Sequence, residues 1–333
     1  SSDLSLTITN LALSTGDITF SGAVGGTTAL DSVTITTAND VTFSSTVRLV
    51  GDLQQQNGTG TSTFNGTSGT GIGGQFVVNT RTIIFNTVDV VTVGAIQLTT
   101  QDTLTLNANA GLNAGSSTIT LLVNQDNTGN HDFTQAGTAI IRTFNNTVDA
   151  VRILVGTTGS ATIGDIRAGT VGGVVSITAD RQIRDNLAGE GPNITAHAAA
   201  LRAGTGIGVD AGGDFNTDVD QLAFSCTGAG ANISNLGDLT LTAVDGLTTS
   251  LASGGGTLFA SGSLTIAMNT LVGGTFNFIA GDDVAGINDL IISANITHLS
   301  GLGEISFQAG DDIIQTAGTI QCIGAPVGGL SRI

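Results

Sequence analysis

The stretch GDITFSG at residues 16–22 returns as NDVTFSS at residues 39–45, which begins 23 residues later. A second pair, FIAGDDV at residues 278–284 and FQAGDDI at residues 307–313, is spaced by 29 residues. Alternating apolar and polar residues followed by Gly, Asn, Asp or Ser are typical of a short β-strand and its turn. A period of about 20–30 residues suits one coil of a β-solenoid, so we expect the copies to stack.

A longer repeat connects FNTVDVVTV at residues 85–93, FNNTVDAVRI at residues 144–153 and FNTDVDQLAF at residues 215–224. The openings are spaced by about 60–70 residues, or about three coils. We therefore predict an all-β chain, with residues 1–333 forming one continuous parallel β-helix of about 13–16 coils and imperfect repeats that open near residues 85, 144 and 215. Strands stacked at about 4.8 Å would give a rod about 60–75 Å long. The alternative is a row of tandem β-sandwich domains, for which this repeat is short.

The composition narrows the class of protein. The 333 residues include 49 Gly and 13 Phe but no Trp, Tyr or Lys, and 24 of the 26 acidic residues are Asp. The net charge of −17 opposes binding to nucleic acid or to anionic lipid, because both need clustered cations. No apolar run approaches the length of a membrane span. Since the chain begins at Ser1, we expect a processed mature protein or a piece of a longer one.

The sequences of the predicted strands and turns also resemble those of a known group of proteins. Residues 16–47 and 201–243, with G-D-apolar-T-apolar strands, the turn AGTGIG and T-x-V-D-x-L openings, are similar to repeats of the filamentous-haemagglutinin-like, large bacterial β-strand-repeat adhesins. The resemblance is one of style and covers most of the chain. It implies a secreted, surface-associated, fibrous β-helical protein with adhesive or scaffolding roles, and cell-surface or matrix glycans as partners. The secretion domain of that family is not identified in this chain.

Catalysis is not predicted. The fragments NTD at residues 216–218 and GDD at residues 281–283 resemble parts of the polygalacturonase signature, in which paired carboxylates act on a glycosidic bond. The Gly-His-Gly and Arg-Ile-Lys segments of that family are missing, and GDD has a twin at residues 310–312. A sugar-cleaving cleft would also usually offer Trp or Tyr. We therefore name no catalytic residue and expect most Asp side chains to cap turns.

Two kinds of surface site are predicted. Stacked turns would bring four carboxylates together, and their oxygens are ligands that Ca²⁺ prefers; these candidates are Asp282, Asp283, Asp311 and Asp312. Ca²⁺ is the one cofactor we consider. Six N-x-S/T triplets fit exposed turns of a secreted protein and are candidate glycosylation sites, at Asn57, Asn65, Asn145, Asn193, Asn232 and Asn295.

A β-helix has two open ends that need caps, and no amphipathic helix is found near either terminus of the sequence. We therefore expect an extracellular structural protein whose partners are further copies of itself, stacked head to tail or joined by exchange of a terminal strand into a surface filament of the kind found in biofilms. The alternative is a shaft fragment of a large secreted adhesin. A third and weaker hypothesis is a polysaccharide-active enzyme.

Overall fold

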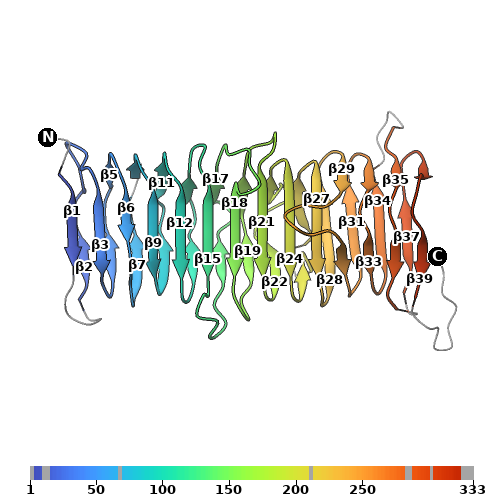
Figure 1. Cartoon of the computed structure of the whole chain (residues 1–333), viewed down its shortest axis with the longest axis horizontal. Helices are drawn as coiled ribbons and strands as arrows, with labels where there is room; N and C mark the ends of the chain where they lie inside the picture. Colours follow the sequence, from blue (N-terminus) through green and yellow to red (C-terminus); the bar gives the residue numbers. More distant parts are fainter. Residues whose placement is uncertain are drawn as a thin grey trace.

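The computed structural model describes residues 4–9, 16–66, 70–209, 213–281, 287–300 and 303–323. These residues form β-strands and turns, with no helix among them. The strands lie across the long axis of a rod, with β1 (Leu6–Thr9) near one end and β39 (Ile320–Cys322) near the other (Figure 1). The chain is therefore an elongated stack of coils, as the short repeat predicts.

Sheet A covers one side of the rod and contains 18 strands among the described residues. Its strands are β1, β3 (Val33–Thr37), β6 (Leu53–Gln55), β9 (Phe76–Thr80), β12 (Ile96–Thr100), β15 (Ile119–Val123), β18 (Val151–Val155), β21 (Val174–Ala179), β24 (Ala198–Ala203), β27 (Gln221–Cys226), β29 (Leu239–Leu241), β30 (Ser250–Ala252), β32 (Leu264–Ile266), β33 (Thr270–Val272), β35 (Leu290–Ile292), β36 (Ile296–His298), β38 (Ile313–Gln315) and β39.

Sheet B closes the coils, and 21 of the strands that the structure describes belong to it. Its strands are β2 (Ile18–Phe20), β4 (Val41–Phe43), β5 (Arg48–Leu49), β7 (Thr61–Phe64), β8 (Thr70–Ile72), β10 (Thr82–Phe85), β11 (Asp89–Thr92), β13 (Leu104–Leu106), β14 (Gly111–Asn113), β16 (Phe133–Gln135), β17 (Ile140–Arg142), β19 (Ala161–Ile163), β20 (Asp165–Arg167), β22 (Gln182–Asp185), β23 (Ile194–Thr195), β25 (Gly206–Ile207), β26 (Phe215–Asp218), β28 (Gly230–Asn235), β31 (Gly256–Ala260), β34 (Phe276–Ala280) and β37 (Ile305–Gln308).

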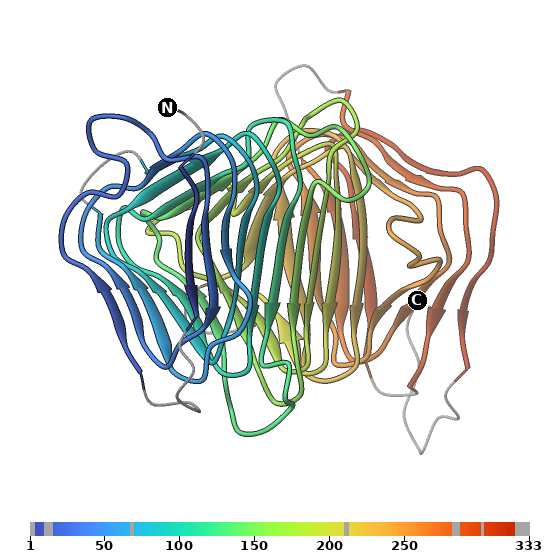
Figure 2. The ribbon, with the colours of Figure 1, turned by 60° about the vertical axis from the view of Figure 1, so that its left-hand side comes forward.

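The pairings between named strands are parallel and join each strand to its counterpart in the next coil, giving a β-solenoid of about 13 coils. The coils follow one another along a single axis (Figure 2). This confirms the parallel β-helix. The alternative of tandem β-sandwich domains is wrong, because the strands of a sandwich are antiparallel.

The short repeats mark the register of the coils. Phe20 pairs with Phe43 across β2 and β4, and Phe278 pairs with Phe307 across β34 and β37. Each pair occupies the same position in the two quoted copies. One coil therefore corresponds to one short repeat, as predicted.

The three longer openings do not share one position. Phe85 ends β10 and Phe215 begins β26, and both are fully buried, whereas Phe144 follows β17 and is 70% exposed. Asp149 and Asp220 both precede strands of sheet A, and these strands are connected through β21 and β24. The second and third openings therefore share a corner three coils apart, while the first contributes its strands to sheet B.

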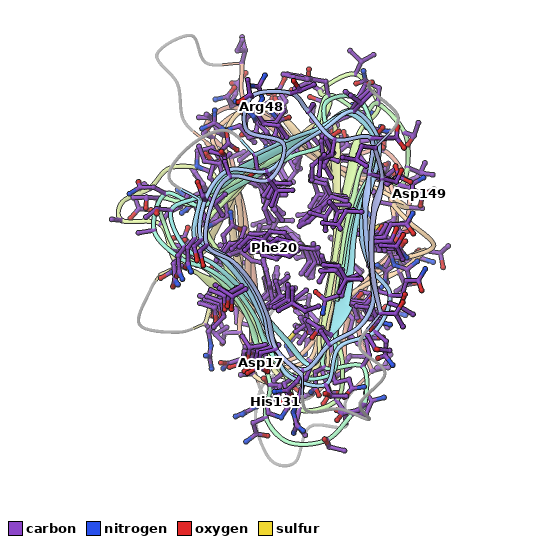
Figure 3. All side chains as sticks on the ribbon, turned by 90° about the vertical axis from the view of Figure 1, so that its left-hand side faces the viewer. Asp17, Phe20, Arg48, His131 and Asp149 are labelled. Atoms are coloured by element: carbon purple, nitrogen blue, oxygen red, sulfur yellow. The ribbon has the colours of Figure 1, made fainter. Side chains whose placement is uncertain are left out.

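Identical side chains stack through the core. Phe20, Phe43, Phe64 and Phe85 form a column with successive ring centroids 4.6, 5.2 and 4.9 Å apart. Figure 3 looks along the rod and shows Phe20 pointing into the interior between the two sheets. Parallel in-register strands place equivalent residues about 4.8 Å apart, which is a suitable spacing for stacked rings.

A ladder of amides follows this aromatic column at the next residue. The Asn86 Nδ2 donates to Asn65 Oδ1 at 2.8 Å, and the Asn107 Nδ2 donates to Asn86 Oδ1 at 2.5 Å. Each amide can donate to one neighbour and accept from the other, so a column of Asn satisfies itself. This explains why Phe-Asn recurs at residues 64–65 and 85–86.

The cross-section changes part-way along the rod. Strand β27 pairs with both β29 and β30, so one long strand of sheet A is continued by two short ones. Strand β28 does the reverse in sheet B, because it pairs with both β25 and β26. Gly256, which follows in β31, has φ +134°, and a Cβ there would lie 1.9 Å from the Ala231 carbonyl oxygen. Only glycine fits this close approach.

In the part of the chain that the structure describes, no helix has the length and apolar character needed to cross a membrane.

Candidate functional site

Aspartates at the corners hold one coil to the next. The backbone N–H of Asp40 donates to Asp17 Oδ1 at 3.2 Å, and the backbone N–H of Thr61 donates to Asp40 Oδ1 at 2.7 Å. Asp17 lies at such a corner in Figure 3. The same contact is made by Asp52, Asp132 and Asp238, which accept from Gln75, Ser160 and Ser263. These carboxylates accept from backbone N–H groups at the corners, which is a structural role.

Two ionisable groups in the turns around Asp102 and His131 have shifted pKa values. The guanidinium of Arg81 donates to Asp102 at 2.7 Å, and this hydrogen bond raises the pKa of Arg81. The backbone N–H and the hydroxyl of Thr128 donate to Asp126, and they lower the pKa of that carboxyl. His131, labelled in Figure 3, has its Nε2 3.3 Å from Asp102 Oδ1. The contacts hold a turn in place.

Three carboxylates meet near the C-terminal end of the described solenoid. Ligand oxygens of Asp289, Asp311 and Asp312 lie within 4.8 Å of one another. The backbone N–H of Asp312 donates to Asp289 Oδ1 at 3.2 Å, so Asp289 also serves as a corner acceptor. Asp311 and Asp312 are exposed and Asp289 is half-buried.

This cluster contains two of the four residues predicted to bind Ca²⁺. Asp311 and Asp312 lie together, whereas Asp282 and Asp283 lie outside the described residues. Sequence reasoning missed Asp289, whose signal was the alignment of NDL at residues 288–290 with DDI at residues 311–313. Three carboxylates would supply part of the 6–8 oxygens of a Ca²⁺ site, and water would complete it. Calcium binding here stays a prediction.

The six candidate glycosylation sites differ in exposure. Asn57 and Asn295 are exposed, and Asn65, Asn145 and Asn232 are half-buried. Asn193 is fully buried, and its Nδ2 donates to the Ile163 carbonyl oxygen at 3.0 Å and to Asp185 Oδ1 at 2.6 Å. The exposed pair are the accessible sites in the folded chain, since a buried amide that donates two hydrogen bonds is closed to modification.

The outermost coils of the described solenoid present free strand edges. Strands β1 and β2 pair only with the coil that follows them, and β37, β38 and β39 pair only with the coil that precedes them, among the strands described. Ile313 and Ile314 of β38 are 52% and 38% exposed, and Leu4 is 64% exposed. Phe20 and Phe307 are only partly buried, although their counterparts inside the rod are fully buried.

The carboxylates of the two polygalacturonase-like fragments are not brought together by any described contact. Asp218 ends β26, and the Asp residues of the GDD fragment lie outside the described residues.

Comparison with known protein families, curated proteins and solved structures gave no match to this chain.

Proposed function

We propose that the protein is an extracellular structural protein, a subunit of a surface filament in which solenoids join end to end. The observation that carries this proposal is the pair of free edges: among the strands described, β1 and β2 at one end, and β37, β38 and β39 at the other, pair with one neighbour each. A free parallel edge offers unpaired N–H and C=O groups to another chain. The free edge at the opposite end of a second copy can pair with these groups if its strands are in the same register.

The two ends differ from one another, so contact between them is heterologous. Such an interface repeats without closing when successive copies share an axis, and it then gives a fibre. Contact would bury Ile313, Ile314 and Leu4, which are exposed in the single chain. The net charge of −17 opposes side-to-side contact. Assembly along the axis is therefore favoured over lateral clustering.

Location outside the cell is part of the proposal. It is supported by the resemblance to secreted β-strand-repeat adhesins, the acidic composition and the exposed triplets at Asn57 and Asn295. The alternative is that this chain is a shaft segment of a large adhesin, in which coils of the same polypeptide cover both edges. The same free edges support that alternative, and assembly of the isolated chain distinguishes the two.

Sedimentation velocity over a range of protein concentration tests the proposal. The wild-type chain should form species whose size grows with concentration. Ile313→Asp should weaken growth about tenfold or more, because burial of an isoleucine contributes about 1.5–3 kcal/mol and a buried carboxylate adds a cost. Val171→Asp is the matched control, since Val171 is 81% exposed on the side of the rod. A wild-type chain that stays monomeric throughout would refute the filament.

A further inference from the structure

A hollow lies on the outer face of sheet B, where the cross-section changes. One cavity of about 220 Å³ is lined by Glu190, Asn216 and Phe259, among others. A second, of about 350 Å³, is lined by Asp214 and Thr257. Both cavities include Ser234 of β28, so they adjoin one another. Residues 186–193, between β22 and β23, supply Glu190 and form one wall.

Asn216 is the unusual residue of this hollow. It lies between Phe215, which is in the core, and Thr217, which bonds inward to Asn235. Its side chain therefore faces outward, yet only 7% of Asn216 is exposed. The backbone N–H of Asn216 donates to Asn193, but the described residues provide no hydrogen bond to its side-chain amide. Asn216 lines the hollow and its amide has no partner among the described residues, so this amide is available for a ligand.

The register extends the hollow into a surface that follows the axis. Asn216 pairs with Ser234, Ser234 with Phe259, and Phe259 with Ile279 of β34. Parallel strands therefore place an amide, a hydroxyl, an aromatic ring and an aliphatic side chain at spacings of about 4.8 Å. A second outward row runs beside it, in which the Asn277 Nδ2 donates to Thr257 Oγ1 at 3.2 Å. Phe259 is half-buried, so part of its ring remains open.

The charges of the lining select among ligands. Glu190 and Asp214 are acidic, and the described lining residues of the two cavities include no Arg or His, so phosphate and carboxylate ligands are repelled. An ammonium group would suit the carboxylates but offers donors only, which leaves the Asn216 Nδ2 without an acceptor. A hydroxyl both donates and accepts. Two neighbouring hydroxyls can satisfy both atoms of one amide.

We propose that this surface, centred on Asn216, Ser234 and Phe259, binds a neutral saccharide. The C–H face of a sugar ring packs on Phe259, while its hydroxyls bond to the Asn216 amide and the Ser234 hydroxyl. Ser234 already donates to Asp214, which leaves its oxygen free to accept. An apolar platform with a few fixed polar groups is the usual composition of a ligand site. The rows of side chains run from coil to coil, so a linear chain would lie along the rod.

Saturation-transfer NMR and titration calorimetry test this with neutral tetrasaccharides of glucose, galactose, mannose and N-acetylglucosamine. At least one should bind with a dissociation constant below about 5 mM. Phe259→Ala should weaken binding at least tenfold, and Asn216→Asp at least fivefold because it removes the amide donor. Phe144→Ala removes an exposed ring elsewhere and should change nothing.

Thermal unfolding followed by circular dichroism shows whether each variant is folded. Asn216→Asp keeps the shape of the side chain, so it remains informative if Phe259→Ala does not fold. The proposal is overturned if no neutral tetrasaccharide binds, if binding is unchanged in Asn216→Asp, or if only tetragalacturonate or an alkylamine binds. The assay uses the side of the rod, so its result is independent of end-to-end assembly.

Discussion

Phe85 and Phe144 begin two closely similar stretches of sequence, but their replacement by alanine should have very different effects on the free energy of unfolding. Phe85 is fully buried, stacked on Phe64 at 4.9 Å and packed edge-on against Phe76 at 6.1 Å. Its loss leaves a cavity inside the column, which costs about 3–5 kcal/mol. Phe144 is 70% exposed, so Phe144→Ala should change the free energy of unfolding by less than about 0.5 kcal/mol.

Hydrogen exchange resolves this prediction locally, because each coil of a solenoid contacts mainly its neighbours. In Phe85→Ala, amides of β10 and of the paired strands β7 and β13 should exchange more than about 100-fold faster, since about 1.4 kcal/mol is a factor of ten. Exchange around β17 should stay unchanged in Phe144→Ala. Equal destabilisation by the two substitutions would refute the register derived for these lines.

Three further predictions concern glycine, calcium and acid. Gly256→Ala should destabilise the chain by about 2 kcal/mol or more in urea denaturation, because Gly256 has a positive φ and a Cβ there would meet the backbone. Gly71→Ala is the control and should be neutral, since a Cβ at Gly71 meets nothing within 4 Å. Similar unfolding midpoints for the two variants would contradict this prediction. CaCl₂ should raise the thermal unfolding midpoint of the wild type more than that of Asp289→Asn. An equal rise in both proteins would show that the carboxylate cluster is not the Ca²⁺ site. Thr128→Val should raise the pKa of Asp126 in a carbon-13 NMR titration, and an unchanged value would contradict the hydroxyl contact. Because the pKa of Asp126 is lowered in the folded chain, its contribution to stability is present above the unfolded pKa and lost as pH falls through the folded one.

Much of the fold could be predicted from local pattern. Period-two alternation and turn residues marked strands such as β3 and β13, and the pairing of Phe278 with Phe307 followed from two matching lines of sequence. Such signals are local, and parallel stacking repeats them once per coil.

The copies of the longer repeat do not all occupy equivalent positions, because similar sequence does not by itself fix the position of a residue in a coil. Phe144 follows β17 in an exposed turn, whereas Phe85 ends a buried strand, and loops of unequal length separate them. The exchange of one long strand for two after β27, and of two short strands for one at β28, also had no local signal, since both depend on which strand lies alongside. Asp289 and the hollow around Asn216 were missed for the same reason. Both are assembled from residues of different coils.

Electron microscopy of negatively stained protein across a range of concentration tests the filament most directly. Thirteen coils at about 4.8 Å give a subunit about 60 Å long, so the account predicts fibres one solenoid wide with an axial repeat of about 60–75 Å. Ile313→Asp should shorten these fibres and Val171→Asp should not. Isolated rods about 60–75 Å long at every concentration would contradict end-to-end assembly.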